Sequence, residues 1–172
     1  MKIIKWILST AIVAMAISCQ PPAAEQPAEQ PAAAAPDHSA LVNSFLAAMD
    51  ANDSTALFAN CSADFVMHHP DSPTPLDRAA FMKHVRDINT ALSGTKHTAV
   101  ETISTANAAA SRGTVAGKHT GTFNGIPASN NDVNVDWISF ATVDANGKIS
   151  ALHVQFNQVV FMTQLGVKLP GS

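Results

Sequence analysis

The chain has 172 residues, which is enough for one ordinary domain, and 47% of them are hydrophobic while 13% are charged. This composition excludes an intrinsically disordered protein. The balance of 10 basic against 13 acidic residues argues against nucleic acid as a partner. Two cysteines cannot form a disulfide scaffold, and no Cys-x-x-Cys pair indicates a zinc ribbon.

Residues 1–18 predict an export signal, because a short basic start precedes an apolar stretch over 6–17 that is too short to span a membrane comfortably. The sequence Ala-Ile-Ser-Cys at 16–19 resembles a bacterial lipobox. The resemblance implies cleavage before Cys19 and acylation of this residue. The alternative is an ordinary cleaved signal followed by an incidental cysteine. Gln20 follows, and by resemblance to enterobacterial sorting it favours an exported lipoprotein in the outer membrane, facing the periplasm.

Residues 19–37 consist mainly of Ala, Pro, Glu and Gln and contain no large apolar side chain. Such a segment cannot bury enough surface to offset its ordering entropy, so it predicts a disordered linker between the lipid anchor and the domain. Residues 38–172 then form a single domain.

The pattern of this domain changes from helical to alternating along the chain. Apolar residues at helical spacing predict a helix over 39–50, and Asp53 is expected to cap a second helix that runs through residue 60. Residues 64–69 read as a strand. Thr74-x-x-Asp77 resembles a capping box before a third helix, which Gly94 is expected to end.

Four extended segments follow, near 96–105, 107–123, 132–143 and 148–157, and residues 161–165 predict a helical turn. The last two strands are joined by Asp144-Ala-Asn-Gly147, a hairpin signal. Helices followed by a run of antiparallel strands predict an α+β fold, in which three N-terminal helices cover one strongly bent sheet.

Two strand faces carry candidate functional groups. In the second long strand, His119 shares a face with Phe123 and with flanking glycines. This pattern indicates either a histidine in an open groove or a solvated glycine-rich bulge. In the last strand, His153, Gln155 and Asn157 share a polar face, which is either a pocket wall or a face that meets solvent.

Other candidates are less specific. Of the adjacent pair His68 and His69, at most one can enter a given pocket. Arg112 can bind an anionic substrate group or pair with a surface carboxylate. Cys61 is expected to be a buried core residue rather than a nucleophile. No metal site is expected, because one would need scattered histidines such as His69, His119 and His153.

Three motifs in register carry a resemblance to a known family. They are the Gly-Lys-His-Thr-Gly-Thr-Phe-Asn-Gly-Ile-Pro-Ala run at 117–128, Asn-Gly-Lys-Ile at 146–149 and Gln-Leu-Gly at 164–166. From about residue 40 to the C-terminus, the chain resembles the SnoaL-like ester cyclases and polyketide cyclases. The resemblance implies the cone-shaped fold of the nuclear transport factor two superfamily, with an apolar cavity inside the curled sheet. It also implies a homodimer through the outer sheet face and no cofactor.

The resemblance further implies site residues. The family's general acid/base is an Asp that falls at Asn157 here, and the family's usual Trp falls at His153. Because an amide cannot exchange a proton at physiological pH, His153 and His119 are the expected acid/base groups. Asn157 is expected to polarise a carbonyl. The expected substrate-binding residues are His69, Arg112, Phe123, Trp137 and Gln155.

Two functions remain open. The first is an enzyme that cyclises, isomerises or hydrolyses a small apolar carbonyl compound. The second is a non-catalytic module that binds a small hydrophobic molecule or a partner protein, which the replacement of the family's Asp by Asn157 favours. A third class, a structural envelope protein, would have a filled cavity.

Overall fold

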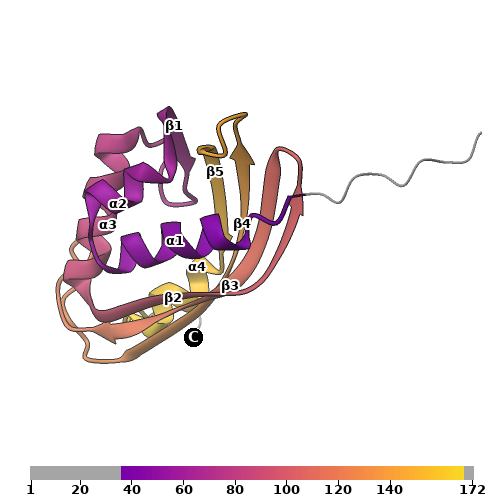
Figure 1. Cartoon of the computed structure of the whole chain (residues 1–172). Coiled ribbons are helices and arrows are strands. Elements are labelled where there is room, and N and C mark those ends of the chain that lie inside the picture. The colour runs from indigo at the N-terminus through magenta and orange to yellow at the C-terminus, as the bar shows by residue number, and fades with distance from the viewer. Residues whose placement is uncertain (1–35, 169–172) are drawn as a thin grey trace, which may run out of the picture. The chain divides into compact units, whose positions relative to one another are not determined.

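The computed structural model describes residues 36–168, in which helices pack on one strongly curled sheet (Figure 1). The helices are α1 (Ser39–Asp50), α2 (Ser54–Ala59), α3 (Arg78–Ala91) and α4 (Gln158–Gln164). The strands are β1 (Cys61–His68), β2 (Leu92–Thr105), β3 (Ala108–His119), β4 (Asp132–Val143) and β5 (Ile149–Phe156). The expected α+β fold is confirmed.

The sheet has the strand order β1-β5-β4-β3-β2. The pairs β2–β3, β3–β4 and β4–β5 are antiparallel, as predicted, but β1 pairs with β5 in parallel. Helices α1, α2 and α3 lie against the concave side, and α4 packs against β4 (Figure 1). The core between these layers includes Phe45, Phe65 and Phe81, whose ring centroids lie 5.4 to 6.2 Å apart. One helix, one strand and a second helix therefore meet at an aromatic contact.

The helix caps agree with the sequence in part. Asp53 accepts hydrogen bonds from the backbone of Thr55 and Ala56, each at 3.0 Å, and so caps α2 as predicted. The capping box at Thr74 is wrong, because Asp77 is itself the N-cap of α3 and accepts from the Ala80 N–H at 2.8 Å. Gly94 does not end this helix either. Helix α3 stops at Ala91, and the chain continues directly into β2.

Strand β3 ends at His119, four residues earlier than predicted. The N–H groups of Thr120 and Gly121 both donate to the Ala91 carbonyl at 3.0 Å, which draws the chain out of the sheet. A Cβ at position 121 would lie 2.3 Å from the Thr90 carbonyl oxygen, so only glycine fits this approach. The following turn carries Phe123 away from the strand.

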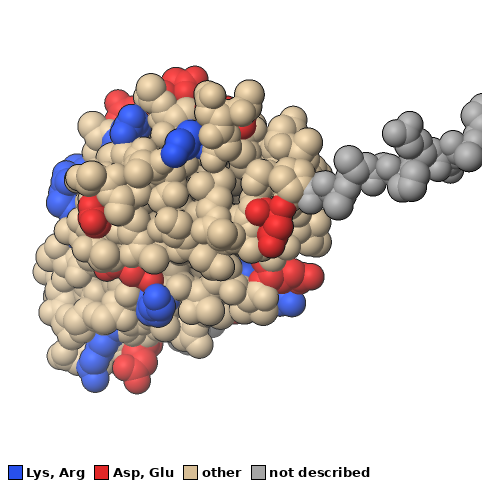
Figure 2. Space-filling view, viewed as in Figure 1, with Lys and Arg blue, Asp and Glu red and all other residues tan. Residues whose placement is uncertain are grey.

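The predicted export signal, Cys19 and the linker up to residue 35 lie outside the described residues. Within residues 36–168, no helix is long and apolar enough to cross a membrane. On the face shown in Figure 2, acidic and basic side chains are interspersed among a majority of uncharged residues.

Candidate active site

A cavity of about 120 Å³ lies between the helices and the concave side of the sheet. Its wall is mainly apolar and includes side chains of α1, α3, the strands and α4. A cavity of roughly this size, when apolar, holds a benzene-sized molecule. Six polar residues interrupt the apolar wall: His69, Asp71, His84, Asn89, His97 and Ser139.

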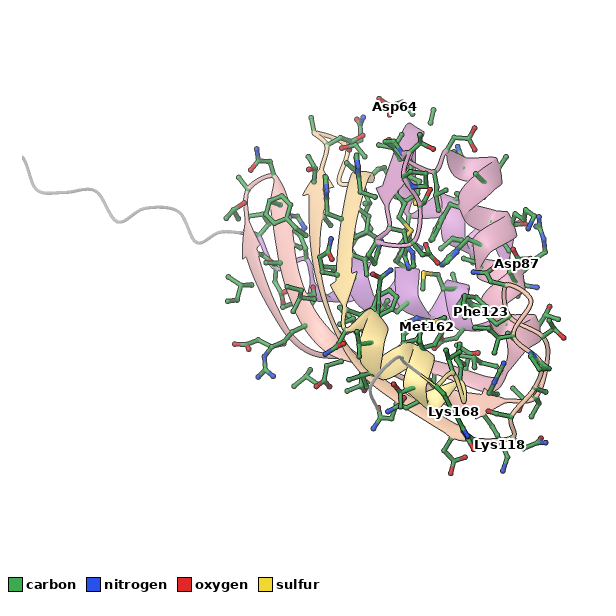
Figure 3. All side chains as sticks on the ribbon, turned by 180° about the vertical axis from the view of Figure 1, so that it is seen from behind. Asp64, Asp87, Lys118, Phe123, Met162 and Lys168 are labelled. Atoms are coloured by element: carbon green, nitrogen blue, oxygen red, sulfur yellow. The ribbon has the colours of Figure 1, made fainter. Side chains whose placement is uncertain are left out.

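Three of the predicted substrate-binding residues lie in this wall: His69, Phe123 and Trp137. Phe123 reaches it from the loop after β3 and meets the ring of Phe161 edge-on at 5.5 Å, near Met162 of α4 (Figure 3). The indole Nε1–H of Trp137 is buried and has no hydrogen-bond partner among the described residues. An unpaired buried donor costs free energy, so a ligand that accepts this hydrogen bond gains affinity.

His119 does not stand in an open groove, contrary to the first interpretation of the second long strand. Its side chain is completely buried, and it is not part of the cavity wall. Nδ1 lies 3.0 Å from the Ser129 hydroxyl and accepts from the Ser129 N–H at 3.3 Å. These bonds tie β3 to the loop that precedes β4. We assign His119 a structural role, because a group sealed from the cavity cannot meet a ligand there.

The polar face of the last strand does not line the apolar cavity but a groove on the outer side of the sheet. His153 and Gln155 are exposed on the outer side of the sheet, where the His153 ring stacks on His68 at 4.0 Å. The opposite face of β5 lines the cavity with Leu152, Val154 and Phe156. The alternation separates the two faces of β5 correctly, but the polar face was expected to meet the cavity. Because the cavity is mainly apolar, the apolar face lines it.

Asn157 and Arg112 are also placed away from the cavity wall. The Asn157 side chain accepts from the Val160 N–H at 3.1 Å and caps α4. The Arg112 guanidinium donates to Glu101 at 2.7 Å on the outer sheet face, where both side chains are more than half exposed. The second interpretation of Arg112, a surface ion pair, is therefore the one that the structure supports. Gln155 lies in the same outer groove as Arg112.

A pair that the sequence analysis missed joins the end of α1 to β2. His97 lines the cavity, and its Nδ1 lies 2.6 Å from the Asp50 carboxylate. The same carboxylate accepts the His97 backbone N–H at 3.1 Å with both oxygens. Lys96 approaches it at 3.4 Å. The carboxylate fixes the imidazole with Nδ1–H toward Asp50, which leaves the Nε2 lone pair as the reactive group.

A signal for His97 was present in the sequence. Along β2, Thr95, His97 and Ala99 alternate with more exposed residues, so His97 belongs to the inward face. No local pattern indicates its partner, because Asp50 lies 47 positions earlier. The contact forms when α1 packs across β2.

A second polar group sits where β1 ends. His69 follows the strand, its Nδ1 bonds the Asp71 carboxylate, and the His84 ring of α3 lies 4.3 Å from the His69 ring. Burial, reinforced by His69, lowers the pKa of His84 to about 4. Burial acts to raise the pKa of Asp71, but the hydrogen bond and charge of His69 outweigh it and lower that pKa.

His84 was also missed, although it falls within the helical stripe of α3, three residues after Phe81 and four before Ile88. One potential ligand atom of each residue, His69, Asp71 and His84, lies within 4.8 Å of the others. The cavity thus has two sets of histidine and carboxylate groups, one at His97 and one at His69. Each set pairs an imidazole with a carboxylate that orients it, an arrangement suited to proton transfer.

The model of the SnoaL-like polyketide cyclases matches residues 39–165 of the chain. The chain belongs to this family. The match begins at the first residue of α1 and ends after α4, so it includes both the sheet and the helices around the cavity. The resemblance predicted from the three motifs is confirmed.

Solved structures share the fold of this SnoaL-like protein at low sequence identity. AclR from Streptomyces galilaeus, proposed to be a hydroxylase, has a TM-score of 0.66 at 22% identity over 76% of this chain and 96% of its own. IdmH from Streptomyces antibioticus, proposed to be a polyketide cyclase, has a TM-score of 0.66 at 21% identity over 77% and 100%. TsrD from Streptomyces laurentii has a TM-score of 0.65 at 20% identity over 74% and 92%. No curated protein matches the chain.

Proposed function

We propose that this SnoaL-like protein is a cofactor-independent enzyme of the cyclase or isomerase type, acting on a small apolar carbonyl compound. His97 is its acid/base group and Asp50 orients it. The observation that carries the proposal is the position of His97 in the cavity wall with Nδ1 held 2.6 Å from Asp50. These two residues replace His153, His119 and Asn157 as the proposed catalytic groups, because those three do not line the cavity.

The proposed reaction begins with a proton on the carbon next to a ketone. This proton moves to Nε2 of His97, and the C–H electron pair forms an enolate. The enolate carbon attacks a second carbonyl of the same molecule and forms a C–C bond, which leaves an alkoxide. The alkoxide then takes the proton back from the imidazolium, so that atoms and charge balance without a cofactor. For isomerisation, the proton returns to a different carbon.

Trp137 supports this reaction from β4, which is separated from the strand of His97 by β3 in the same sheet. Its buried Nε1–H has no partner among residues 36–168 and can donate to the enolate oxygen. Donors already fixed in a site with little water stabilise a developing negative charge more than water does. Phe123 and the apolar side chains of β5 would hold the hydrocarbon part of the substrate.

The experiment that tests the proposal follows proton exchange. Acetophenone is a small aryl ketone whose methyl protons exchange slowly with neutral D₂O, and NMR measures their loss. The full chain is expected to accelerate this exchange, and His97→Ala is expected to reduce the acceleration by about 10²- to 10⁴-fold. His153→Ala, on the outer face, is the matched control and should retain the wild-type rate. An unchanged rate in His97→Ala would overturn the assignment.

The second candidate function is a non-catalytic module that binds a small hydrophobic molecule. The observation that favours it is Asn157, which stands where the family's acid is expected and serves here as the cap of α4. Native mass spectrometry of the purified chain tests this candidate through a co-purified ligand. A retained apolar ligand, together with no exchange above the buffer rate, would support the binding module against the enzyme.

Partner and location also remain proposals. We propose a homodimer through the outer sheet face, supported by four exposed apolar side chains there: Val100, Ile103, Ile138 and Phe140. We also keep the proposal of an exported lipoprotein anchored at Cys19 in the outer membrane, supported by the sequence at 16–19. The anchor would be the contact with the membrane, and nucleic acid is not a proposed partner.

A further inference from the structure

The group formed by His69, Asp71 and His84 has no part in the proposed proton transfer. The three residues come from the end of β1, the loop after it and the middle of α3. All three line the cavity, and one ligand atom from each lies within 4.8 Å of the others. Two imidazoles and one carboxylate are a donor set that divalent transition metals prefer.

The fold holds these donors in place. The backbone groups of Met67 and Leu76 exchange two hydrogen bonds of 2.8 Å, which close the loop that carries His69 and Asp71. The Ser72 N–H also donates to the His69 carbonyl at 3.0 Å. The His69 side chain is only 9% exposed and packs against the ring of Phe156, with 5.4 Å between centroids. These contacts fix the position of the His69 side chain more firmly than that of a histidine on an exposed surface.

His84 lacks a hydrogen-bond partner. No hydrogen bond joins its ring to another residue in the described part of the chain, although His69 and Asp71 lie beside it. The His84 ring is partly buried, and its nitrogens are not among the sealed, unpaired polar atoms of the described residues, so they are open to a ligand. A metal ion between His84 and its two neighbours would bind a ring nitrogen of His84 and the carboxylate of Asp71.

The distances require a small adjustment. In a tetrahedral zinc site with bonds of about 2.0–2.1 Å, donor atoms lie roughly 3.4 Å apart. The donor atoms here lie within 4.8 Å of one another, so contraction by at most about 1.4 Å at the widest pair is sufficient. Rotation of the His84 side chain and movement of the Asp71 carboxylate, which is 28% exposed, can provide it.

We propose that His69, Asp71 and His84 bind one divalent transition-metal ion of the zinc class at the cavity wall. Three protein ligands leave a coordination position open to the cavity, as in catalytic rather than structural zinc sites. A bound ion would polarise the carbonyl oxygen of a cavity ligand. This inference goes beyond the proposed function, which needs no metal, and it replaces the expectation that the protein has no metal site.

The test measures metal binding and not catalysis, so it is independent of the acid/base proposal. The full chain is treated with EDTA, exchanged into chelator-free buffer and titrated with Zn²⁺ by calorimetry. Co²⁺ is titrated in parallel, because its visible absorption reports the number of ligands. We expect one ion per chain and a tetrahedral or five-coordinate Co²⁺ spectrum.

Single-residue variants identify the side chains that bind the Zn²⁺ ion. His84→Ala and Asp71→Asn are each expected to weaken Zn²⁺ binding by at least about 10-fold. The matched control is His153→Ala, which removes one ring of the exposed His68–His153 stack and should leave the affinity unchanged. If His84→Ala fails to fold by circular dichroism, Asp71→Asn on the loop carries the test.

Two results would overturn the proposal. The first is no stoichiometric binding by the wild-type chain, in which case Asp71 serves only to orient His69 by a hydrogen bond. The second is binding that survives both His84→Ala and Asp71→Asn but falls in His153→Ala, which would place the ion on the outer histidine stack.

Discussion

The carboxylate of Asp50 lies 2.6 Å from Nδ1 of His97 and also accepts the His97 backbone N–H. Asp50 is the last residue of α1, where a negative charge is unfavourable for the helix dipole. A carboxylate at this position therefore does not stabilise the helix. It stabilises the packing of α1 on β2 instead, because its hydrogen bonds hold the His97 imidazole in the wall of a mainly apolar cavity.

Gly113 of β3 is expected to tolerate no side chain. A Cβ there would lie 2.0 Å from the Thr98 carbonyl oxygen and 2.5 Å from the ring of Trp137. Because backbone cannot move aside as a side-chain tip can, Gly113→Ala should lower the free energy of unfolding by at least about 2 kcal/mol. Urea denaturation measures the loss.

The control for this prediction lies on the same strand. A Cβ at Gly117 would approach the nearest atom, Cβ of Leu92, to 3.2 Å, so Gly117→Ala should cost clearly less. If both variants lose the same free energy of unfolding, the close contacts of Gly113 with Thr98 and Trp137 do not explain the effect of a side chain at this position.

Stability should fall in mild acid because of His84. Its pKa is about 4 in the folded chain, lowered by burial and by His69, and near 6.5 when unfolded. The unfolded chain therefore binds more protons between these values, and the stabilisation present at neutral pH is lost as pH falls. Between pH 7 and pH 5, His84 should account for about 2 kcal/mol of lost unfolding free energy.

Urea denaturation in EDTA at the two pH values measures this effect. His84→Gln should show a smaller loss of stability than the wild type, by about the amount stated, because Gln does not titrate in this range. His153→Gln is the control and should show the wild-type loss. An undiminished loss in His84→Gln would mean that other groups cause the acid sensitivity.

The proposed dimer makes a prediction about the outer sheet face. Ile138 of β4 is 60% exposed there, beside Phe140. Size-exclusion chromatography with light scattering should find a dimer for the wild-type chain and a monomer for Ile138→Lys, because a lysine would be desolvated at the contact. Val159→Lys is the matched control, since Val159 is equally exposed but lies on α4. A dimer that persists in Ile138→Lys would contradict this interface.

The proposed lipid anchor rests on one side chain. Cys19→Ser removes the thiol that would carry the diacylglycerol, so labelling with radioactive palmitate in a bacterial host should disappear and the chain should leave the membrane fraction. Cys61→Ser is the control, because this buried residue should have no effect on labelling. Labelling that persists in Cys19→Ser would contradict the lipoprotein prediction.

Local patterns in the sequence predicted most of the elements. Helical spacing located α1, the Asp53 cap was correct, and alternation located β4 to the residue. The parallel pairing of β1 with β5 was not predicted, because it joins strands about 90 residues apart and leaves no local signature. The predicted capping box at Thr74 is wrong because Asp77, which directly precedes α3, is the N-cap of that helix.

The candidate site was predicted less well, for two physical reasons. The alternation of β5 separated its polar and apolar faces correctly, but the choice of the polar face for the cavity assumed a polar pocket, whereas Leu152 and Val154 line a mainly apolar one. The pair of Asp50 and His97 depends on the packing of a helix against a strand, which periodicity does not reveal. Trp137 was predicted correctly because it lies on the inward face of β4, whereas Phe123 lines the cavity from the loop after β3 and not from the strand face on which the alternation placed it.

We propose that Asp50 and His97 together move a proton within the cavity. The rate of hydrogen–deuterium exchange of acetophenone, measured with the wild-type chain and with Asp50→Asn, each in EDTA, tests this directly. Asp50→Asn keeps the size of the side chain but removes the charge that orients and stabilises the imidazolium. We predict a wild-type rate well above that of buffer and a fall of at least about 10²-fold in Asp50→Asn. Exchange by Asp50→Asn at the wild-type rate would show that Asp50 has no part in the proton transfer.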